Sequence, residues 1–560
     1  MSKQIIGPQQ VRNAWEVLQR YRSGKANLEK RVIENQQWYK LRHWQCLQKT
    51  PSQIEPASGW LFNAIAGKHA DAMDNIPAIN VLPREANDVA QAKLLSAVIP
   101  VVLEHSDFEE VYHRIWDHKL IGGTGIYGVF WDKDKLGGMG DVTVCPVDVL
   151  NLYWQSGVND IQKSKNVFHI ALQDNDSLLS AYPQLEGKLG NTAQEMGRYI
   201  YDDAQDTTDQ TLVVDWYYKK ACDGRILLHY CKFVGETVLY ASENDPACCT
   251  TGWYAHGQYP FVFDPLFRTE GSPCGFGYID VGKSAQEFID RGNQALLQNL
   301  LVNARPRYFI RDDGAVNEQE FADLSRDLIH VDGNLGADSV VPVRSTPLDS
   351  TFVAMVNNKI QELKEVTGNR DVLAGGTSGG VTAASAIAAM QEAGSKLSRD
   401  SNKASYRAFR KVCLLVIELM RQFYDLPRCF RITGEESYVN FSNALIAPQH
   451  QGMDLGRDMG YRVPLFDVTV SAQKQSPYSK LSQNELAIQF FNAGFFDPTR
   501  AEQALACLEM MDFDRKDAVM KSIRERALPG AAAPMTAMAT AGQDPVVKAR
   551  ARVAEVAAPR

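Results

Sequence analysis

The chain of 560 residues, 45% hydrophobic and 22% charged, has the composition of an ordinary globular protein and is long enough for about two to four domains. Its formal net charge of −8 argues against a protein whose whole surface clamps nucleic acid, because that function needs a basic field. Ten cysteines without paired CxxC spacing argue against a disulfide scaffold and against a zinc site.

The longest clean apolar run, Val412 to Ile417, is much shorter than the roughly 18 residues that a membrane span needs. The first residues lack the apolar core of a signal peptide. We therefore expect a cytosolic protein that does not bind a membrane.

The first part of the chain is predicted to be mainly helical. Residues 9–48 intersperse polar and basic side chains with Trp15, Leu18 and other apolar residues, and a second helical stretch starts near Gly59. An extended segment bounded by prolines follows, and then two further helices that lead into a strand at residues 126–131.

A formal match to the dinucleotide-binding pattern GxGxxG lies at Gly123, Gly125 and Gly128. That fold needs a strand, then the glycines, then a helix whose N-terminus faces the pyrophosphate. Here a helix that ends near Leu120 precedes the glycines, and a strand follows them. The reversed order predicts a helix-to-strand turn and argues against a nucleotide site.

Residues 141–270 are rich in strand patterns such as VTVCPV, VFHIAL and TLVVDWYYKK, separated by glycine, aspartate and asparagine. Strand and helix patterns do not alternate here as they would in a parallel sheet. The segregation of the elements predicts an α+β fold.

From Gly277 to Arg305 the pattern is helical, with one face expected to be buried and one offered to water or a partner. The polar face holds Asp290, Arg291, Asn293 and Gln294. The stripe expected to be buried comprises Val281, Ala285, Phe288, Gly292, Ala295 and Leu296.

An insert at residues 307–347 shows short strand and helix patterns. It is too small for a strong core of its own, so we expect it to pack against a neighbour. A helix from Asp349 to Gly368 follows it, and Lys359 lies within its apolar arc, where it must reach water or meet an acidic partner. The apolar face of this helix is formed by Phe352, Val356, Ile360 and Leu363.

The next segment, NRDVLAGGTSGG, is predicted to be a mobile loop, because glycine-rich backbone is costly to order. Residues 382–424 are rich in alanine and free of proline, which predicts a single helix of about 43 residues. Strand patterns return after it, and further helices are expected from Ser482 and from Asp497. Residues 528–560 are expected to be largely disordered.

The order of these elements resembles that of the portal proteins of tailed bacteriophages, over roughly residues 55–525. Three stretches carry the resemblance. GGTGIYGVFWD is similar to the family's helix-to-strand junction, VGKSAQEFIDRGNQALLQNLLVNARP to its first stem helix, and NRDVLAGGTSGG to its tunnel loop. The resemblance rests on the order and spacing of these stretches.

The resemblance implies a ring of about twelve subunits at one capsid vertex, with no catalytic site. It also implies a division of the chain into named parts. These are N-terminal helices and an α+β wing (1–276), a first stem helix (277–305), a clip (306–348), a second stem helix (349–368), a tunnel loop (369–381), a long wing helix with returning wing strands (382–480), a helical crown (481–527) and a tail (528–560).

The implied ring is the channel for genome packaging and ejection, located in the virion and, during assembly, in the host cytoplasm. The implied partners are other copies of the chain, double-stranded DNA, the major capsid and scaffolding proteins, the terminase packaging motor and a head-tail adaptor protein. No cofactor and no metal are expected. Twelve copies at −8 would give a ring near −96, so DNA would be centred by repulsion and not gripped.

Three groups of residues are candidates for contact with DNA or with a neighbouring subunit. On the second stem helix, the candidates for the channel wall are Asn357, Gln361, Lys364 and Glu365. In the loop, backbone N–H and hydroxyl groups that would meet phosphates belong to Gly375, Gly376, Thr377, Ser378, Gly379 and Gly380. On the long helix, a basic stripe is formed by Lys396, Arg399, Lys403, Arg407 and Arg410.

Each group has a plainer interpretation. The two sets of helical residues are also typical of solvated helix faces, and the loop is also typical of a flexible surface turn. Two other functions stay open on the sequence alone. One is an enzyme that acts on nucleic acid or nucleotides, which ATP hydrolysis would reveal, and the other is a helical scaffold protein, which would be a monomer, dimer or filament.

Overall fold

The computed structural model of the chain describes residues 5–48, 54–189, 199, 207–222, 224–304, 308–310, 316–323, 325, 327–331, 340–342, 349–368, 396–432, 438–450, 453–454, 457–458, 460–474, 488–490, 492–494, 501–509, 519–520 and 523. The chain divides into two compact units, Met1–Lys474 and Gln475–Arg560.

The described helices are α1 (Pro8–Tyr39), α2 (His43–Cys46), α3 (Trp60–Met73), α4 (Val89–Glu104), α5 (Phe108–Gly122), α6 (Lys135–Gly138), α7 (Asn175–Ala181), α8 (Tyr278–Ala304), α9 (Glu318–Ala322), α10 (Ser350–Thr367), α12 (Lys396–Phe423) and α14 (Ala501–Glu509). The predicted helix of residues 382–424 is thus seen from Lys396 onward, and its first part lies outside the described residues.

The described strands are β1 (Asn75–Pro83), β2 (Thr124–Asp132), β3 (Asp141–Pro146), β4 (Leu152–Trp154), β5 (Asn166–Asp174), β6 (Gln210–Cys222), β7 (Arg225–Val234), β8 (Thr237–Ala241), β9 (Phe261–Pro265), β10 (Phe267–Arg268), β11 (Gly275–Phe276), β12 (Tyr308–Ile310), β13 (Val340–Pro342), β14 (Arg428–Arg431), β15 (Tyr438–Phe441), β16 (Gln449–His450), β17 (Met453–Asp454), β18 (Arg457–Asp458), β19 (Tyr461–Arg462) and β20 (Phe466–Lys474).

The paired strands run antiparallel. One sheet has the order β4-β5-β6-β7-β8, in which each strand pairs with its neighbour in sequence, and a second has the order β3-β2-β9. The remaining sheets are two-stranded. The fold is therefore mixed α+β, as the segregation of strand and helix patterns predicts.

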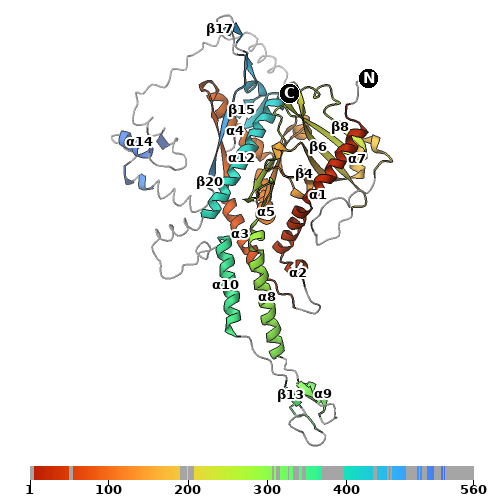
Figure 1. Cartoon of the computed structure of the whole chain (residues 1–560). Coiled ribbons are helices and arrows are strands. Elements are labelled where there is room, and N and C mark those ends of the chain that lie inside the picture. The colour runs from red at the N-terminus through yellow and green to blue at the C-terminus, as the bar shows by residue number, and fades with distance from the viewer. Residues whose placement is uncertain are drawn as a thin grey trace, which may run out of the picture. The chain divides into compact units, whose positions relative to one another are not determined.

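The helix α12 lies at the centre of the first unit, where Figure 1 shows it among α4, α5 and the strands. Its apolar face is fully buried, with Val412, Val416 and Met420 at zero exposure. It packs against β1, β2, β9 and β20. The strands β1 and β20 pair from Asn75↔Lys474 to Pro83↔Phe466, so segments almost 400 residues apart in sequence form one sheet. Both strands of this sheet pack against α12.

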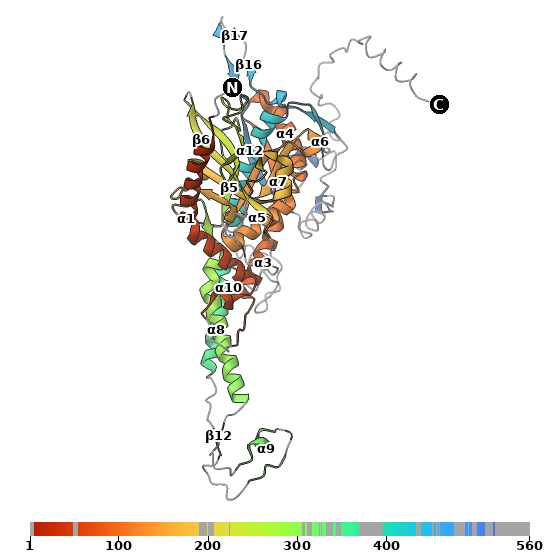
Figure 2. The ribbon, with the colours of Figure 1, turned by 90° about the vertical axis from the view of Figure 1, so that its right-hand side faces the viewer.

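The helix α1 covers the five-stranded sheet, as Figure 2 shows beside β5 and β6. Val11, Ala14 and Leu18 recur at three- and four-residue spacing and are buried in one cluster with Phe168 and Val214. These residues form the face of α1 that is buried against the sheet.

The glycine motif forms the junction between α5 and β2. Gly123 caps α5 with φ +90° and its N–H donates to the carbonyl of Lys119. A Cβ on Gly123 would lie 2.6 Å from backbone atoms of Phe276, so a larger residue would not fit. It would also be strained at this positive φ. This confirms the prediction of a helix-to-strand turn.

Within the described residues, the stretch Ala86–Glu104 is long and apolar enough to cross a membrane by length and composition alone. Leu95, Val98 and Val102 have zero exposure, and the helix packs against β1 and α12. This burial is typical of a core helix in a globular protein.

The second unit is described in α14 and a few neighbouring residues. Phe490, Leu505, Leu508 and Ile523 form a small apolar cluster of their own. The helix starts predicted at Ser482 and Asp497 lie outside the described residues.

A buried ion pair ties α5 to β9 and α12. The Lys119 ammonium donates to Asp264 Oδ1 at 2.9 Å and to Ser405 Oγ at 2.6 Å, and Ser405 in turn donates to Asp264 Oδ2 at 2.5 Å. Both charged side chains are at most 1% exposed. Burial lowers the pKa of Lys119, while the Asp264 carboxylate opposes that shift.

Replacing Lys119 should destabilise the first unit strongly, because Lys119→Met leaves the buried Asp264 carboxylate without its cation. We expect a loss of about 3–5 kcal/mol in the free energy of unfolding. All nine tryptophans lie in the first unit, so their fluorescence during urea denaturation reports the unfolding of that unit.

The matched control is Arg114→Met on the same helix, which removes an ion pair with Glu110 whose side chains are 62% and 54% exposed. This variant should lose less than about 1 kcal/mol. Equal urea midpoints for the two variants would contradict the assigned role of Lys119.

Candidate functional site

The helices α8 and α10 pack side by side (Figure 1), and α10 carries the residues predicted to line a channel. Gly292 of α8 faces Val356 of α10, and a Cβ on Gly292 would lie 2.7 Å from a Val356 methyl carbon. The absence of a side chain at Gly292 lets the two helices approach closely. Gly368 caps α10 with φ +68°, which agrees with the predicted helix end.

The predicted buried face of α8 is wrong in part. Ala285 is buried, but Val281 and Phe288 of the apolar stripe are each 38% exposed. Asp290 and Gln294, which were assigned to the exposed polar face, are buried instead. The helix is rotated about its axis relative to the prediction because its polar residues have specific partners in the N-terminal segment.

Asp290 is the centre of these contacts. Its Oδ1 accepts hydrogen bonds from the backbone N–H of Ser58 at 3.0 Å, the Ser58 hydroxyl at 2.8 Å and the Gln286 amide at 3.0 Å. Its Oδ2 lies 2.5 Å from Nδ1 of His43, and both side chains have zero exposure. Contacts from His43 and Ser58 thus fix the middle of α8 to the start of α2 and to the segment after it, and Gln286 adds a hydrogen bond within α8.

The geometry around His43 shows which ring nitrogen donates to the backbone. Nε2 of His43 lies 3.0 Å from the backbone carbonyl of Trp38, which can only accept, so Nε2 carries a hydrogen. The other ring nitrogen, Nδ1, faces Oδ2 of Asp290, so the imidazole joins the backbone of Trp38 to the carboxylate on α8.

The predicted channel residues on α10 differ in their surroundings. Asn357, Gln361 and Glu365 are exposed, whereas Lys364 is half-buried with its ammonium 5.4 Å from the centre of the Trp60 ring. The structure thus brings three of the four together on an exposed face and directs the fourth toward α3.

Lys359 meets an acidic partner in its own chain. Its ammonium lies 2.6 Å from Glu362 and 5.7 Å from the centre of the Phe288 ring on α8. The residue is half-buried at the edge of the helix pair. The expected acidic partner of Lys359 is therefore found within the same chain.

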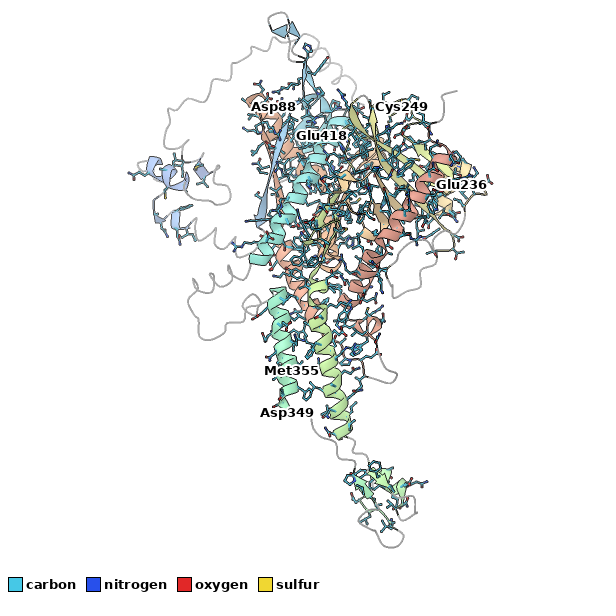
Figure 3. The ribbon with its side chains drawn as sticks, viewed as in Figure 1. Asp88, Glu236, Cys249, Asp349, Met355 and Glu418 are labelled. Atoms are coloured by element: carbon cyan, nitrogen blue, oxygen red, sulfur yellow. The ribbon has the colours of Figure 1, made fainter. Side chains whose placement is uncertain are left out.

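Both helices also expose large apolar side chains. Leu300 and Leu301, near the end of α8, are 62% and 50% exposed, and Met355 of α10, labelled in Figure 3, is 49% exposed. Further apolar residues of the pair that are more than a third exposed are Val281, Phe288, Leu297, Val302, Phe352, Val353 and Val366. Such a concentration of apolar surface on one helix pair is typical of a protein interface.

The described part of the basic stripe lies on the exposed face of α12, at Arg399, Lys403, Arg407 and Arg410. The end of the stripe is already close to an acid, since Arg410 lies 3.8 Å from Asp467. Arg84 binds the same carboxylate with two hydrogen bonds and holds the pKa of Asp467 below its usual range. The side chain of Lys396 lies outside the described residues.

The candidate loop residues also lie outside the described part of the chain. Gly375, Gly376, Thr377, Ser378, Gly379 and Gly380 fall in the range 369–395. Their predicted contact with phosphates stays a prediction from the sequence.

The insert contains a short antiparallel pair, β12 with β13, and the helix α9. Phe309 and Leu328 are 67% and 76% exposed. These apolar side chains agree with the expectation that the insert needs a neighbour to complete its core.

Asp290 should be essential for anchoring α8. Asp290→Ala leaves His43, Ser58 and Gln286 without their buried acceptor, and we expect it to lower the free energy of unfolding by about 3–5 kcal/mol. Asp290→Asn should recover about 1–3 kcal/mol of this loss, because its amide can donate to Nδ1 of His43 while its oxygen still accepts from Ser58. Urea denaturation followed by tryptophan fluorescence measures both variants, and equal losses would argue against this hydrogen-bonding scheme.

Comparison with known families identifies the family of the chain. The chain matches the family model described as phage P22-like portal protein over residues 64–559, which is most of its length. A comparison with curated proteins found no match. The chain therefore belongs to the phage P22-like portal protein family, whose members are structural proteins of the virion that form the portal for DNA packaging and ejection at a capsid vertex.

Proposed function

We propose that the α8–α10 pair is the stem of this portal, with one surface in contact with neighbouring subunits and another facing the DNA channel. The family builds a ring oligomer that interacts with the capsid and with DNA. A ring of identical subunits needs heterologous contacts, in which two different surfaces of each chain meet. Two kinds of exposed surface on the pair, one apolar and one polar, supply what such a ring requires.

The observation that carries this proposal is the apolar surface at the end of α8. Leu297, Leu300 and Leu301 lie within two helical turns of one another and are exposed in the single chain. Burying such residues between subunits stabilises the ring by about 25 cal/mol per Å² of apolar area removed from water. The same residues left in water would favour nonspecific association.

The channel wall is proposed to be the exposed polar surface of α10, at Asn357, Gln361 and Glu365. Two of these residues are neutral and one is acidic, so a ring of them presents no cation to the phosphates. Mixed neutral and negative walls allow a duplex to slide, since tight phosphate binding depends on Lys and Arg. The exposed residues of the basic stripe before Arg410, namely Arg399, Lys403 and Arg407, are proposed to face acidic groups of the next subunit.

The insert is proposed to be the clip, completed by the insert of a neighbouring subunit and offered to the packaging motor and the head-tail adaptor. Its exposed Phe309 and Leu328 supply apolar contacts for that pairing. Residues 369–381 are proposed to be the tunnel loop, on the strength of their glycines and of their place after α10. The ring is proposed to contain about twelve chains, together near 750 kDa for subunits of 62.4 kDa.

Charged residues at the end of α8 should prevent ring assembly. In the double variant Leu300→Glu and Leu301→Glu, each subunit interface would have to bury carboxylates without partners, at a cost of several kcal/mol per interface. We expect the purified variant to stay monomeric in mass photometry under conditions in which the unmodified chain forms rings.

The matched control for that variant is Leu426→Glu, because Leu426 is 54% exposed and follows α12 in the turn before β14. The control should assemble normally. Rings formed by the double variant as readily as by the control would contradict the proposed interface.

A cation on the proposed channel wall should slow the passage of DNA. Gln361→Lys would add about one positive charge per subunit to the lumen, and each phosphate contact makes binding depend steeply on salt. We expect normal rings but slower DNA packaging at low salt, with recovery as the salt concentration rises. Gln361→Asn is the neutral control, and unchanged packaging by the lysine variant at every salt concentration would place Gln361 outside the channel.

A further inference from the structure

We propose that His69, His113 and Asp117 form a site for one divalent transition-metal ion between α3 and α5. Each of these residues offers one ligand atom, and the three atoms lie within 4.8 Å of one another. The site is separate from the stem and from the buried ion pairs described above.

The helices position the ligands from two directions. His113 and Asp117 are four residues apart on α5, so they lie on the same helix face and can hold one ion together. His69 lies on α3, and the centre of its ring is 4.2 Å from the centre of the His113 ring. The spacing on α5 is visible in the sequence, whereas the approach of His69 depends on the fold.

Two of the distances, one to each oxygen of Asp117, are close to those around a bound ion. Nε2 of His69 lies 3.5 Å from Asp117 Oδ1, and Nδ1 of His113 lies 3.4 Å from Asp117 Oδ2. An ion held tetrahedrally at about 2.0–2.2 Å from nitrogen and oxygen ligands separates those ligands by about 3.3–3.6 Å. Small side-chain rotations therefore suffice to bring the three groups around an ion.

The ligand chemistry favours zinc or cobalt. Imidazole nitrogen with one carboxylate suits Zn²⁺ and its neighbours in the first transition row, whereas Ca²⁺ and Mg²⁺ prefer oxygen ligands alone. The side chains are 14%, 50% and 37% exposed for His69, His113 and Asp117, so an ion can enter from solvent. Three protein ligands leave a position for water.

A bound ion would connect α3 and α5, and both of these helices pack against other elements of the first unit. Asp117 lies two residues before Lys119, the cation of the buried pair that joins α5 to α12. The helix α3 packs closely against α8 where Leu61 faces Gly282, because a Cβ added to Gly282 would lie 2.4 Å from a side-chain carbon of Leu61. An ion that binds the folded chain and not the unfolded one stabilises the folded chain by mass action.

The experiment uses the full chain, first treated with a chelator and then exchanged into chelator-free buffer. Co²⁺ is titrated with visible absorption and Zn²⁺ with isothermal calorimetry. We expect one ion per chain bound through nitrogen and oxygen, without the near-ultraviolet band of a cobalt–thiolate bond. The presence of that band would indicate that cobalt binds to free cysteines and not to this site.

The test variant is His113→Ala, and its matched control is His118→Ala, a histidine on the same helix outside the cluster. We expect the test variant to bind more than about tenfold more weakly, since even loss of an outer partner of a metal ligand costs tenfold or more. The control should bind as the unmodified chain does.

Asp117→Asn is a second test variant, and tryptophan fluorescence spectra check that all the variants are folded. Equal affinity of the folded His113→Ala and His118→Ala chains would overturn the proposal. So would the absence of binding to the folded unmodified chain, or binding accompanied only by the thiolate band.

Discussion

The carboxylate of Asp290 is fully buried in the middle of α8, and its two oxygens bind separate groups, one at the start of α2 and one in the segment after it. A buried charge of this kind is stable only with its full set of partners, so the rotation of α8 about its axis is fixed. That rotation decides which side chains α8 leaves exposed. The apolar residues Phe288, Leu297 and Leu300 are left for other contacts because Gln286, Asp290 and Gln294 take the buried side.

The electrostatics of the chain agree with a conduit for DNA. The formal charge is −8. Among the predicted wall positions on α10, Glu365 is exposed, and the one cationic residue, Lys364, is half-buried. Lys364 is turned toward Trp60 and Lys359 toward Glu362. The cations of the pair are thus held by groups of the same chain, which limits their contact with phosphates.

Much of the fold follows from local sequence signals. The strand patterns, the glycine junction at Gly123 and the cap at Gly368 were predictable because they depend on neighbouring residues. The buried face of α8 was not, because Asp290 finds His43 at a separation of 247 residues and hydropathy assigns a carboxylate to water. The same holds for Lys119, whose partners Asp264 and Ser405 are 145 and 286 residues away. Of the four candidate wall positions on α10, Asn357, Gln361 and Glu365 are exposed and Lys364 is half-buried, and their role in a channel stays a proposal.

The most direct test of the central claim is a cryo-electron microscopy map of the assembled ring at side-chain resolution. The account predicts that Asn357, Gln361 and Glu365 line the central channel and that Leu300 and Leu301 are buried between adjacent subunits. A closed ring in which the α8–α10 pair lies on the outer wall, with another element around the channel, would contradict it.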